Sequence, residues 1–343
     1  MKKHRNLRQQ RSLPKLQKNI TTGGTLKESC AGRGGCMQCH RIYFIALVLC
    51  MLASSAEGQS PPAAVDAYNR AASYYKKGDI DGAIAELTQA IEISSHPGST
   101  RSGAAGAFNL NKIKILDPLT AAAYSNRGMM RFHKRDFDGA IDDCTLALKI
   151  NPRLAEAYIY RGISHSAKKD FDAALSDLNR ALAIDPRNAE AHNNRGVTYT
   201  EKGDYNKAIA DFDQAIKLKH RLIEAYCNRG FALRGKGDLD GSLRDFDYAL
   251  TINPRLAMAY FGRGVVLSDL EDLERAIIEY NRAIELDPEL AVAYANRGLV
   301  LILQGKDLQA EQDLSRALAL EPSLKFDFDQ KIELVKQLRR KRH

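Results

Sequence analysis

The sequence predicts an all-α fold, a right-handed superhelical solenoid built from helix–turn–helix units. Prolines or their replacements recur every 34 residues, and the set comprises Pro118, Pro152, Pro186, His220, Pro254, Pro288 and Pro322. A glycine column and a tyrosine column repeat at the same interval. A period of this length is typical of solenoids, in which each unit buries its apolar face only against its neighbours.

The period divides the chain into successive units. Residues 57–97 hold a first unit, and residues 98–120 form an insert that we expect to be a flexible loop. Residues 121–324 hold six contiguous units. The polar segment 325–343 is expected to form a capping helix with a basic tail, because the last unit of a solenoid needs a polar outer face.

Each unit is predicted to contain two helices joined by a short turn. In Lys202-Gly203-Asp204 and in Lys236-Gly237-Asp238, glycine would end the first helix and aspartate would cap the second. The residue before a proline resists the helical conformation, so the Asn-Pro and Asp-Pro pairs close each unit.

Small residues recur inside the predicted helices. Glycine in the middle of a helix costs about 1 kcal/mol relative to alanine. Because every contiguous unit repeats this glycine, we expect the partner helix to cross too closely for a side chain there. The column comprises Gly128, Gly162, Gly196, Gly230, Gly264 and Gly298. His192 replaces the tyrosine of the neighbouring column and is interpreted as a packed ring rather than a metal ligand.

The recurring pattern resembles the tetratricopeptide repeat. It reads Ala-Tyr-x-Asn-Arg-Gly, then Gly-Asp-Tyr/Phe, Ala-Ile, Asp-Phe, Ala-Ile and Asp-Pro, and it covers 64–97 and 121–324. His220 in place of proline, Ser242 in place of alanine and the Lys306-Asp307 turn depart from it. The resemblance implies an array that binds peptides or partner proteins on its concave face.

The resemblance also narrows the kind of ligand. A row of asparagines is similar to the row in the repeat domain of the protein O-linked N-acetylglucosamine transferases, although no catalytic domain is recognised in this sequence. Glu156, Glu190 and Glu224 occupy a column where repeats that clamp a terminal carboxylate have Lys or Arg. Acidic C-terminal tails are therefore disfavoured, and a neutral or cationic extended segment is expected.

The positive charge of the chain is confined to its N-terminal end. Residues 1–56 hold ten Lys and Arg and one acid, whereas residues 57–343 are neutral overall, although the whole chain has a net charge of +9. A neutral body lacks the basic surface that binds phosphates, which excludes nucleic acid as a partner.

Residues 37–56 have the form of a secretory signal peptide. Basic residues precede the apolar run 42–53, and the small residues 54–56 follow it as a cleavage site. The run is shorter than the roughly 20 residues of a membrane-spanning helix. We expect an exported bacterial-type protein, periplasmic or secreted, with 1–36 as a disordered basic extension. The alternative is an uncleaved signal that anchors the chain in the inner membrane.

A row of arginines with matched acids is interpreted as a structural brace. In every unit an acid follows the arginine after sixteen residues, and this spacing reaches the facing helix. A planar guanidinium can donate two bonds to one carboxylate. The middle pairs are Arg127 with Asp143, Arg161 with Asp177, Arg195 with Asp211 and Arg229 with Asp245. The alternative is that the arginines line a groove for an acidic polysaccharide.

The asparagine row defines the predicted peptide-binding face. With asparagine at 0° on the first helix, the tyrosine column lies at about 160° and the glycine column at about 200°, so asparagine points away from the core. Amides can hold an extended backbone, with apolar residues as a floor and acids at the edge. The predicted contacts are Asn69, Asn126, Tyr160, Asn194, Asn228, Asn296, Glu156, Glu190, Glu224, Met129 and Phe231. The alternative is that neighbouring first helices cover this stripe.

The cysteines suggest little chemistry. Cys36-Met37-Gln38-Cys39-His40 matches the attachment motif of c-type haem, but it precedes the apolar run and should stay on the side where haem is not attached. Cys144 and Cys227 are more than two repeats apart, so we expect packing thiols rather than a disulfide.

The predicted function is that of a non-catalytic scaffold for proteins or extended peptides. No catalytic residue, metal or cofactor is expected, and membrane contact is expected only through an uncleaved N-terminal segment. One alternative is a subunit of a cell-envelope assembly or polysaccharide-export complex. The other is a c-type haem protein that uses Cys36, Cys39 and His40.

Overall fold

The computed structural model describes residues 61–95 and 118–342, and within them every regular element is a helix. They divide into two compact units: an N-terminal unit of residues 61–95 and 118–198, and a C-terminal unit of residues 199–342. Segments 1–36 and 37–56, with the haem-like motif, lie outside the described residues, as does the insert up to residue 117.

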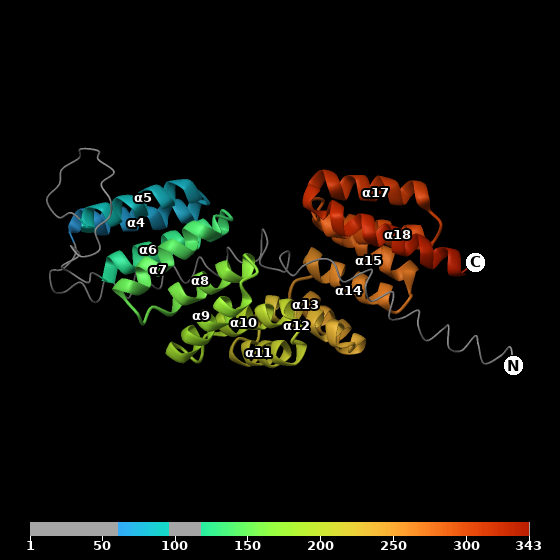
Figure 1. Cartoon of the computed structure of the whole chain (residues 1–343), viewed down its shortest axis with the longest axis horizontal. Helices are drawn as coiled ribbons and strands as arrows, with labels where there is room; N and C mark the ends of the chain where they lie inside the picture. The colour runs from blue at the N-terminus through green and yellow to red at the C-terminus, as the bar shows by residue number, and fades with distance from the viewer. Residues whose placement is uncertain (1–60, 96–117, 343) are drawn as a thin grey trace. The chain divides into compact units, whose positions relative to one another are not determined.

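The N-terminal unit is a series of helix pairs (Figure 1). In each pair the two helices pack directly on one another, and the second helix also packs on the first helix of the next pair. The elements are α4 (Pro62–Lys77), α5 (Ile80–Ser95), α6 (Pro118–His133), α7 (Phe137–Ile150), α8 (Ala155–Ala167), α9 (Phe171–Ile184) and α10 (Ala189–Glu201), the last of which crosses the unit boundary.

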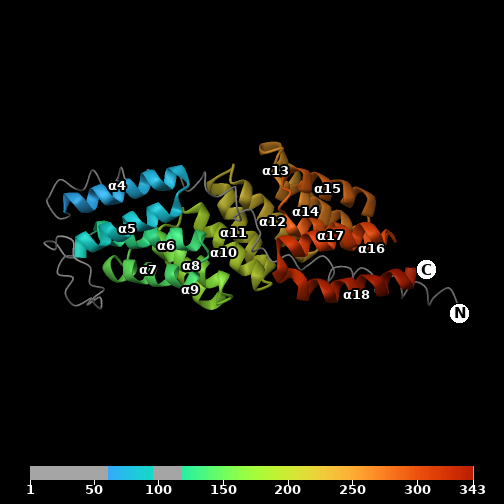
Figure 2. The ribbon, with the colours of Figure 1, turned by 90° about the horizontal axis from the view of Figure 1, so that it is seen from above.

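The C-terminal unit repeats this arrangement. Its elements are α11 (Tyr205–Leu218), α12 (Ile223–Lys236), α13 (Leu239–Ile252), α14 (Ala257–Asp269), α15 (Leu273–Leu286), α16 (Ala291–Leu303), α17 (Asp307–Leu320), η3 (Pro322–Leu324) and α18 (Lys325–Arg342). The terminal helix α18 lies beside α16 (Figure 2), and its Val335 and Leu338 are buried. The predicted all-α array of paired helices is therefore confirmed in each unit.

The turns within the pairs follow the predicted chemistry. Gly203 and Gly237 have φ angles of +79° and +98°, the left-handed conformation that glycine adopts freely. The Asp238 carboxylate accepts a hydrogen bond from the backbone N of Gly241 at 2.8 Å, which caps α13. Glycine as the end of the first helix and aspartate as the cap of the second are both confirmed.

Helix α6 begins earlier than the period predicts. It starts at Pro118, three residues before the expected unit boundary at 121. Proline fits the first turn of a helix, because its missing N–H would have no partner there and its φ angle is already helical.

Two glycines of the column leave no room for a side chain, as predicted, and three others would place a Cβ only 3.0 Å from a neighbour. A Cβ on Gly128 would lie 2.7 Å from Cys144 Sγ, and one on Gly264 would lie 2.7 Å from the Tyr280 ring. Both partners belong to the second helix of the same pair. Close crossing of the two helices therefore accounts for the mid-helix glycines.

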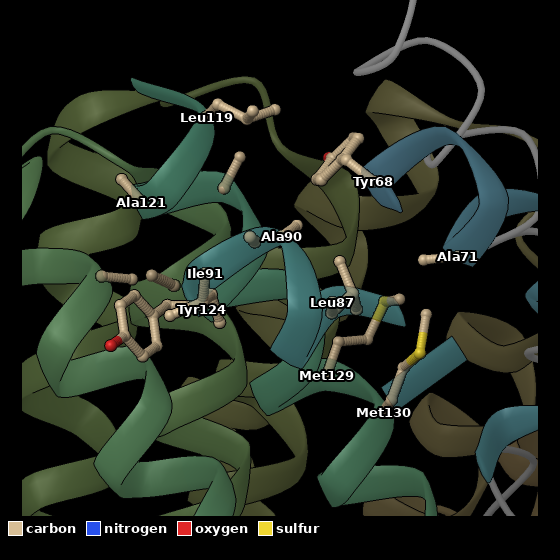
Figure 3. Close-up of a cluster of buried hydrophobic side chains, with 14 of the residues drawn as sticks. Tyr68, Ala71, Leu87, Ala90, Ile91, Leu119, Ala121, Tyr124, Met129 and Met130 are labelled. Carbon is tan, nitrogen blue, oxygen red and sulfur yellow. The ribbon is translucent and has the colours of Figure 1, made fainter. Parts of the chain in front are cut away.

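The main apolar cluster of the N-terminal unit draws residues from α4, α5, α6, α7 and α8. Tyr68 and Ala71 from α4, Leu87 and Ile91 from α5, and Met130 from α6 are all buried together (Figure 3). Cys144 belongs to the same cluster, and Cys227 is buried in a cluster of the C-terminal unit. Both thiols are free and buried, as expected of packing residues.

Candidate interaction surface

Every arginine of the predicted row except Arg195 is seen to reach the acid sixteen residues further on. Arg161 donates from Nε and Nη2 to the two carboxylate oxygens of Asp177 at 2.8 and 2.7 Å. Arg127 bonds Asp143 in the same way, at 2.8 and 2.7 Å. The same two bonds join Arg229 to Asp245 and Arg297 to Asp313, whereas Arg70 reaches Glu86 and Arg263 reaches Glu279 through one carboxylate oxygen.

The third donor of these guanidinium groups points to the preceding pair. Arg161 Nη1 donates to Thr145 Oγ1 at 3.2 Å, and Arg229 Nη1 donates to Asp213 Oδ1 at 2.5 Å. Equivalent bonds run from Arg127 to Thr88, Arg195 to Asn179, Arg263 to Asp247 and Arg297 to Asn281. Each of these arginines therefore links the first helix of its own pair to the second helix of the preceding pair. The repeat pattern alone did not predict this contact.

The pair Arg195 and Asp211 stays a prediction. Arg195 lies in the N-terminal unit and Asp211 in the C-terminal unit, so the geometry between them is not described. The bond from Arg195 Nη1 to Asn179 Oδ1, at 2.7 Å, lies entirely within the N-terminal unit.

The surroundings of the arginines after Arg70, which is itself exposed, limit their contact with water. The side chains of Arg161 and Asp177 are 21% and 9% exposed. Hydrogen bonding to Asp177 raises the pKa of Arg161, against the opposing effect of burial, so the guanidinium stays charged. Arg161 also lies over the ring of Tyr158, 5.6 Å from its centroid. This geometry favours a brace over an open groove for an anionic polymer.

The asparagine row does not form one exposed surface. Asn126 is buried, and its Nδ2 donates to the Tyr68 hydroxyl at 2.6 Å. Asn296 is buried as well, and its Nδ2 donates to the carbonyl of Val292 in its own helix at 2.8 Å. Asn228 is 2% exposed and Tyr160 is 8% exposed. Only Asn69, which is exposed, and Asn194, which is half-buried, offer substantial surface.

The two apolar residues predicted as a groove floor contribute mainly to packing. Met129 is 4% exposed and belongs to the core cluster of the N-terminal unit. Phe231 is half-buried, with ring centroids 5.0 Å from Phe246 and 6.3 Å from Phe261. These positions fit the alternative in which neighbouring helices cover the stripe.

The predicted acids keep partly exposed carboxylates at one recurring position. Glu156, Glu190 and Glu224 are each the second residue of a first helix, and each is half-buried. Burial is the main cause that raises the pKa of Tyr68, and the Asn126 bond opposes it, while the charge of Glu156 raises that pKa further. The charge of Glu156 on α8 is therefore near enough to Tyr68 of α4 to act on its hydroxyl.

The described residues contain no cluster of three or more His, Cys, Asp or Glu arranged to hold a metal ion. His192 is half-buried, with Nε2 3.1 Å from the carbonyl oxygen of Pro186. No helix among the described residues is both long and apolar enough to cross a bilayer.

Comparison with protein families identifies the repeat in several places. Family models described as tetratricopeptide repeat match residues 121–154 and 189–222, and also 67–97. A model described as TPR repeat matches residues 165–201 and 266–305. A comparison with curated proteins gave no match.

Solved structures with the same fold include two bacterial proteins. A tetratricopeptide repeat protein from Parabacteroides merdae is 20% identical, with a TM-score of 0.62 over 80% of this chain and 99% of its own. PilF from Pseudomonas aeruginosa is 19% identical, with a TM-score of 0.50 over 61% of this chain and 95% of its own. At these identities the likeness concerns the fold alone.

Proposed function

Because the chain belongs to the tetratricopeptide repeat family, we propose that it is a non-catalytic scaffold that binds extended segments of partner proteins. Proteins of this family serve in general as protein-interaction scaffolds. The proposed contact surface in the N-terminal unit is the first-helix face, which we define by Asn69, Glu156, Glu190 and Asn194.

The recurring carboxylates are the observation that carries the proposal. Glu156 and Glu190 lie one repeat apart on the first helices α8 and α10, and both are half-buried. Partial desolvation strengthens attraction to an opposite charge, and the remaining contact with water limits the cost of burying the carboxylate. A ligand with Lys or Arg side chains, or a neutral extended backbone, suits this face better than an acidic one.

The amides of the row divide into two roles. Asn69 and Asn194 have surface to offer a ligand, so each can donate to and accept from an extended backbone. Asn126 and Asn296 already donate within the protein, to Tyr68 and to Val292. We therefore assign contact to the first two residues and positioning to the other two.

Charge removal on the first-helix face tests this function. Binding of a short labelled lysine-containing peptide to the full chain would be measured by fluorescence anisotropy. Replacing Glu156 and Glu190 with Gln should weaken binding about threefold per carboxylate, since each contact is partly exposed. Asp142→Asn is the matched control, because Asp142 is an exposed acid on the second helix α7.

Two results would count against the proposal. One is a Glu156→Gln, Glu190→Gln variant that binds the basic peptide as tightly as the unchanged chain. The other is an equal loss with Asp142→Asn, because the effect would then reflect overall charge rather than the first-helix face.

Export to the periplasm or the medium is part of the proposal. Residues 37–56, with a basic start, an apolar middle and a small-residue end, support it. An anchored envelope-assembly subunit is the alternative. Cell fractionation with N-terminal sequencing separates the two, because a mature chain that begins after Ala56 supports export and an intact one in the membrane supports anchoring.

A further inference from the structure

A second set of arginines lies in the loops that join one helix pair to the next. All of them are exposed, and within the described residues their side chains make no hydrogen bond or ion pair. They recur at the 34-residue period and comprise Arg153 and Arg187 in the N-terminal unit and Arg221 and Arg255 in the C-terminal unit. Their guanidinium groups are available to a partner, unlike those of the internal row.

Three of these loops, those of Arg153, Arg187 and Arg255, hold the arginine backbone through an Asn or Asp side chain, whereas Arg221 follows Lys219, which cannot accept such a bond. The backbone N of Arg153 donates to Asn151 Oδ1 at 3.0 Å, and that of Arg255 donates to Asn253 Oδ1 at 3.0 Å. Such turns formed by an Asn side chain restrict the loop and fix the direction in which the next residue points. In the following loop Glu289 stands at the corresponding position, so the basic row ends there.

In the C-terminal unit an exposed tyrosine lies at the end of the helices where these arginine loops are. Tyr248, in the final turns of α13, is 43% exposed, and its ring centroid is 4.4 Å from that of Tyr226 in the first turn of α12. Both tyrosines therefore adjoin the loops that carry Arg221 and Arg255. Tyrosine and arginine are the side chains most enriched at the energetic centres of protein interfaces.

We propose that Arg221, Arg255 and Tyr248, the arginine–tyrosine edge, bind an extended acidic segment of a partner polypeptide. Helices α12 and α14 pack against each other, and packed helices lie about 8–10 Å apart. Three residues of extended chain span about 10 Å, so acids at every third residue match the two loops. Each carboxylate can take two bonds from one guanidinium.

This inference goes beyond the proposed function, because it concerns another surface and a ligand of opposite charge. The first-helix face selects basic or neutral segments, whereas the arginine–tyrosine edge selects acidic ones. An aromatic anchor beside the arginine loops favours a polypeptide over a uniform polyanion, which offers no apolar group to Tyr248.

The test measures binding of a labelled extended peptide with glutamate at every third position and a central tyrosine. The full chain is used at low salt, and the same peptide with glutamine in place of glutamate is the ligand control. Arg221→Gln with Arg255→Gln should weaken binding about tenfold, and Tyr248→Ala about threefold. Lys236→Gln with Arg340→Gln removes equal charge, from the far end of α12 and from α18, and should change binding less than twofold.

The outcomes separate this inference from its competitors. No binding of the acidic peptide, or an equal loss in the Lys236→Gln, Arg340→Gln variant, would overturn it. Tighter binding of inorganic polyphosphate or of phosphatidylglycerol vesicles than of the peptide, lost in the Arg221→Gln, Arg255→Gln variant, would mean that the edge serves another class of ligand. The Glu156→Gln, Glu190→Gln variant should bind the acidic peptide normally, so failure of one proposal leaves the other testable.

Discussion

Arg229 and Asp245 form a two-bond ion pair that joins the two helices of one repeat. The guanidinium donates to both carboxylate oxygens at 2.8 and 2.7 Å, and its remaining arm reaches Asp213 on α11 at 2.5 Å. Hydrogen bonding to Asp245 is the main cause that raises the pKa of Arg229. One side chain therefore connects three helices, α11, α12 and α13.

Removing this arginine should destabilise the protein. Arg229→Gln would leave Asp245, whose side chain is 8% exposed, without its charged partner. The expected loss is about 2 kcal/mol in the free energy of unfolding, between the cost of breaking an exposed pair and that of breaking a buried one. Urea unfolding followed by circular dichroism measures it. Arg244→Gln is the control, because Arg244 is exposed on α13, and equal losses in the two variants would contradict the brace.

The turn residues predict opposite effects of glycine at matched positions. Lys169 has a φ angle of +66°, a conformation that is strained for a residue with a Cβ, so Lys169→Gly should stabilise the protein by about 0.5–1 kcal/mol. Lys149→Gly, in the last turn of α7, should destabilise it by up to about 1 kcal/mol. Thermal unfolding of both variants measures the two changes in stability. A loss of stability in both would refute the assignment of strain at Lys169.

A missing helix cap can be restored. Asp170 caps α9, because its Oδ1 accepts from the backbone N of Ala173 at 3.2 Å, whereas Lys306 gives α17 no side-chain cap. Lys306→Asp should therefore raise the free energy of unfolding by about 1 kcal/mol, and Asp170→Ala should lower it by a similar amount. Hydrogen exchange in the first turn of α17 provides the local measurement. Unchanged exchange there would mean that no cap had formed.

A buried ring explains one gap in the asparagine row. A Cβ on Gly262 would overlap the ring of Phe246. The same ring also lies against Gly230, which belongs to the same repeat as Phe246. Gly262→Asn should destabilise the C-terminal unit by about 1–3 kcal/mol, and adding Phe246→Leu should recover part of the loss. A double-mutant cycle measures this coupling, and strictly additive losses would show that Phe246 is not the obstacle.

The sequence alone was sufficient to predict the repeat architecture. Period, glycine stop and aspartate cap are local features, so Gly237 and Asp238 could be assigned roles without any knowledge of packing. The second arm of the arginine row was missed, although its signal was present. Thr145, Asn179, Asp213 and Asn281 each precede an arginine by sixteen residues and can accept a hydrogen bond.

The exposure of the asparagine side chains could not be predicted from their angular positions on a single helix. The angular position of Asn126 places it away from its own partner helix but does not reveal that Tyr68 of another pair lies against it. The gap at Gly262 could not be predicted either. Phe246 precedes Gly262 by sixteen residues, and Phe212 precedes Asn228 by the same number, yet an asparagine is accommodated at 228. Contacts between repeats depend on side-chain rotamers that a periodic pattern does not determine.

Hydrogen exchange of the full chain, with and without the lysine-containing peptide, tests the central claim most directly. The scaffold account predicts that bound peptide slows exchange in the first helices α8 and α10 and leaves α7 and α9 unchanged. Protection confined to the second helices, or no protection at a saturating peptide concentration, would contradict it.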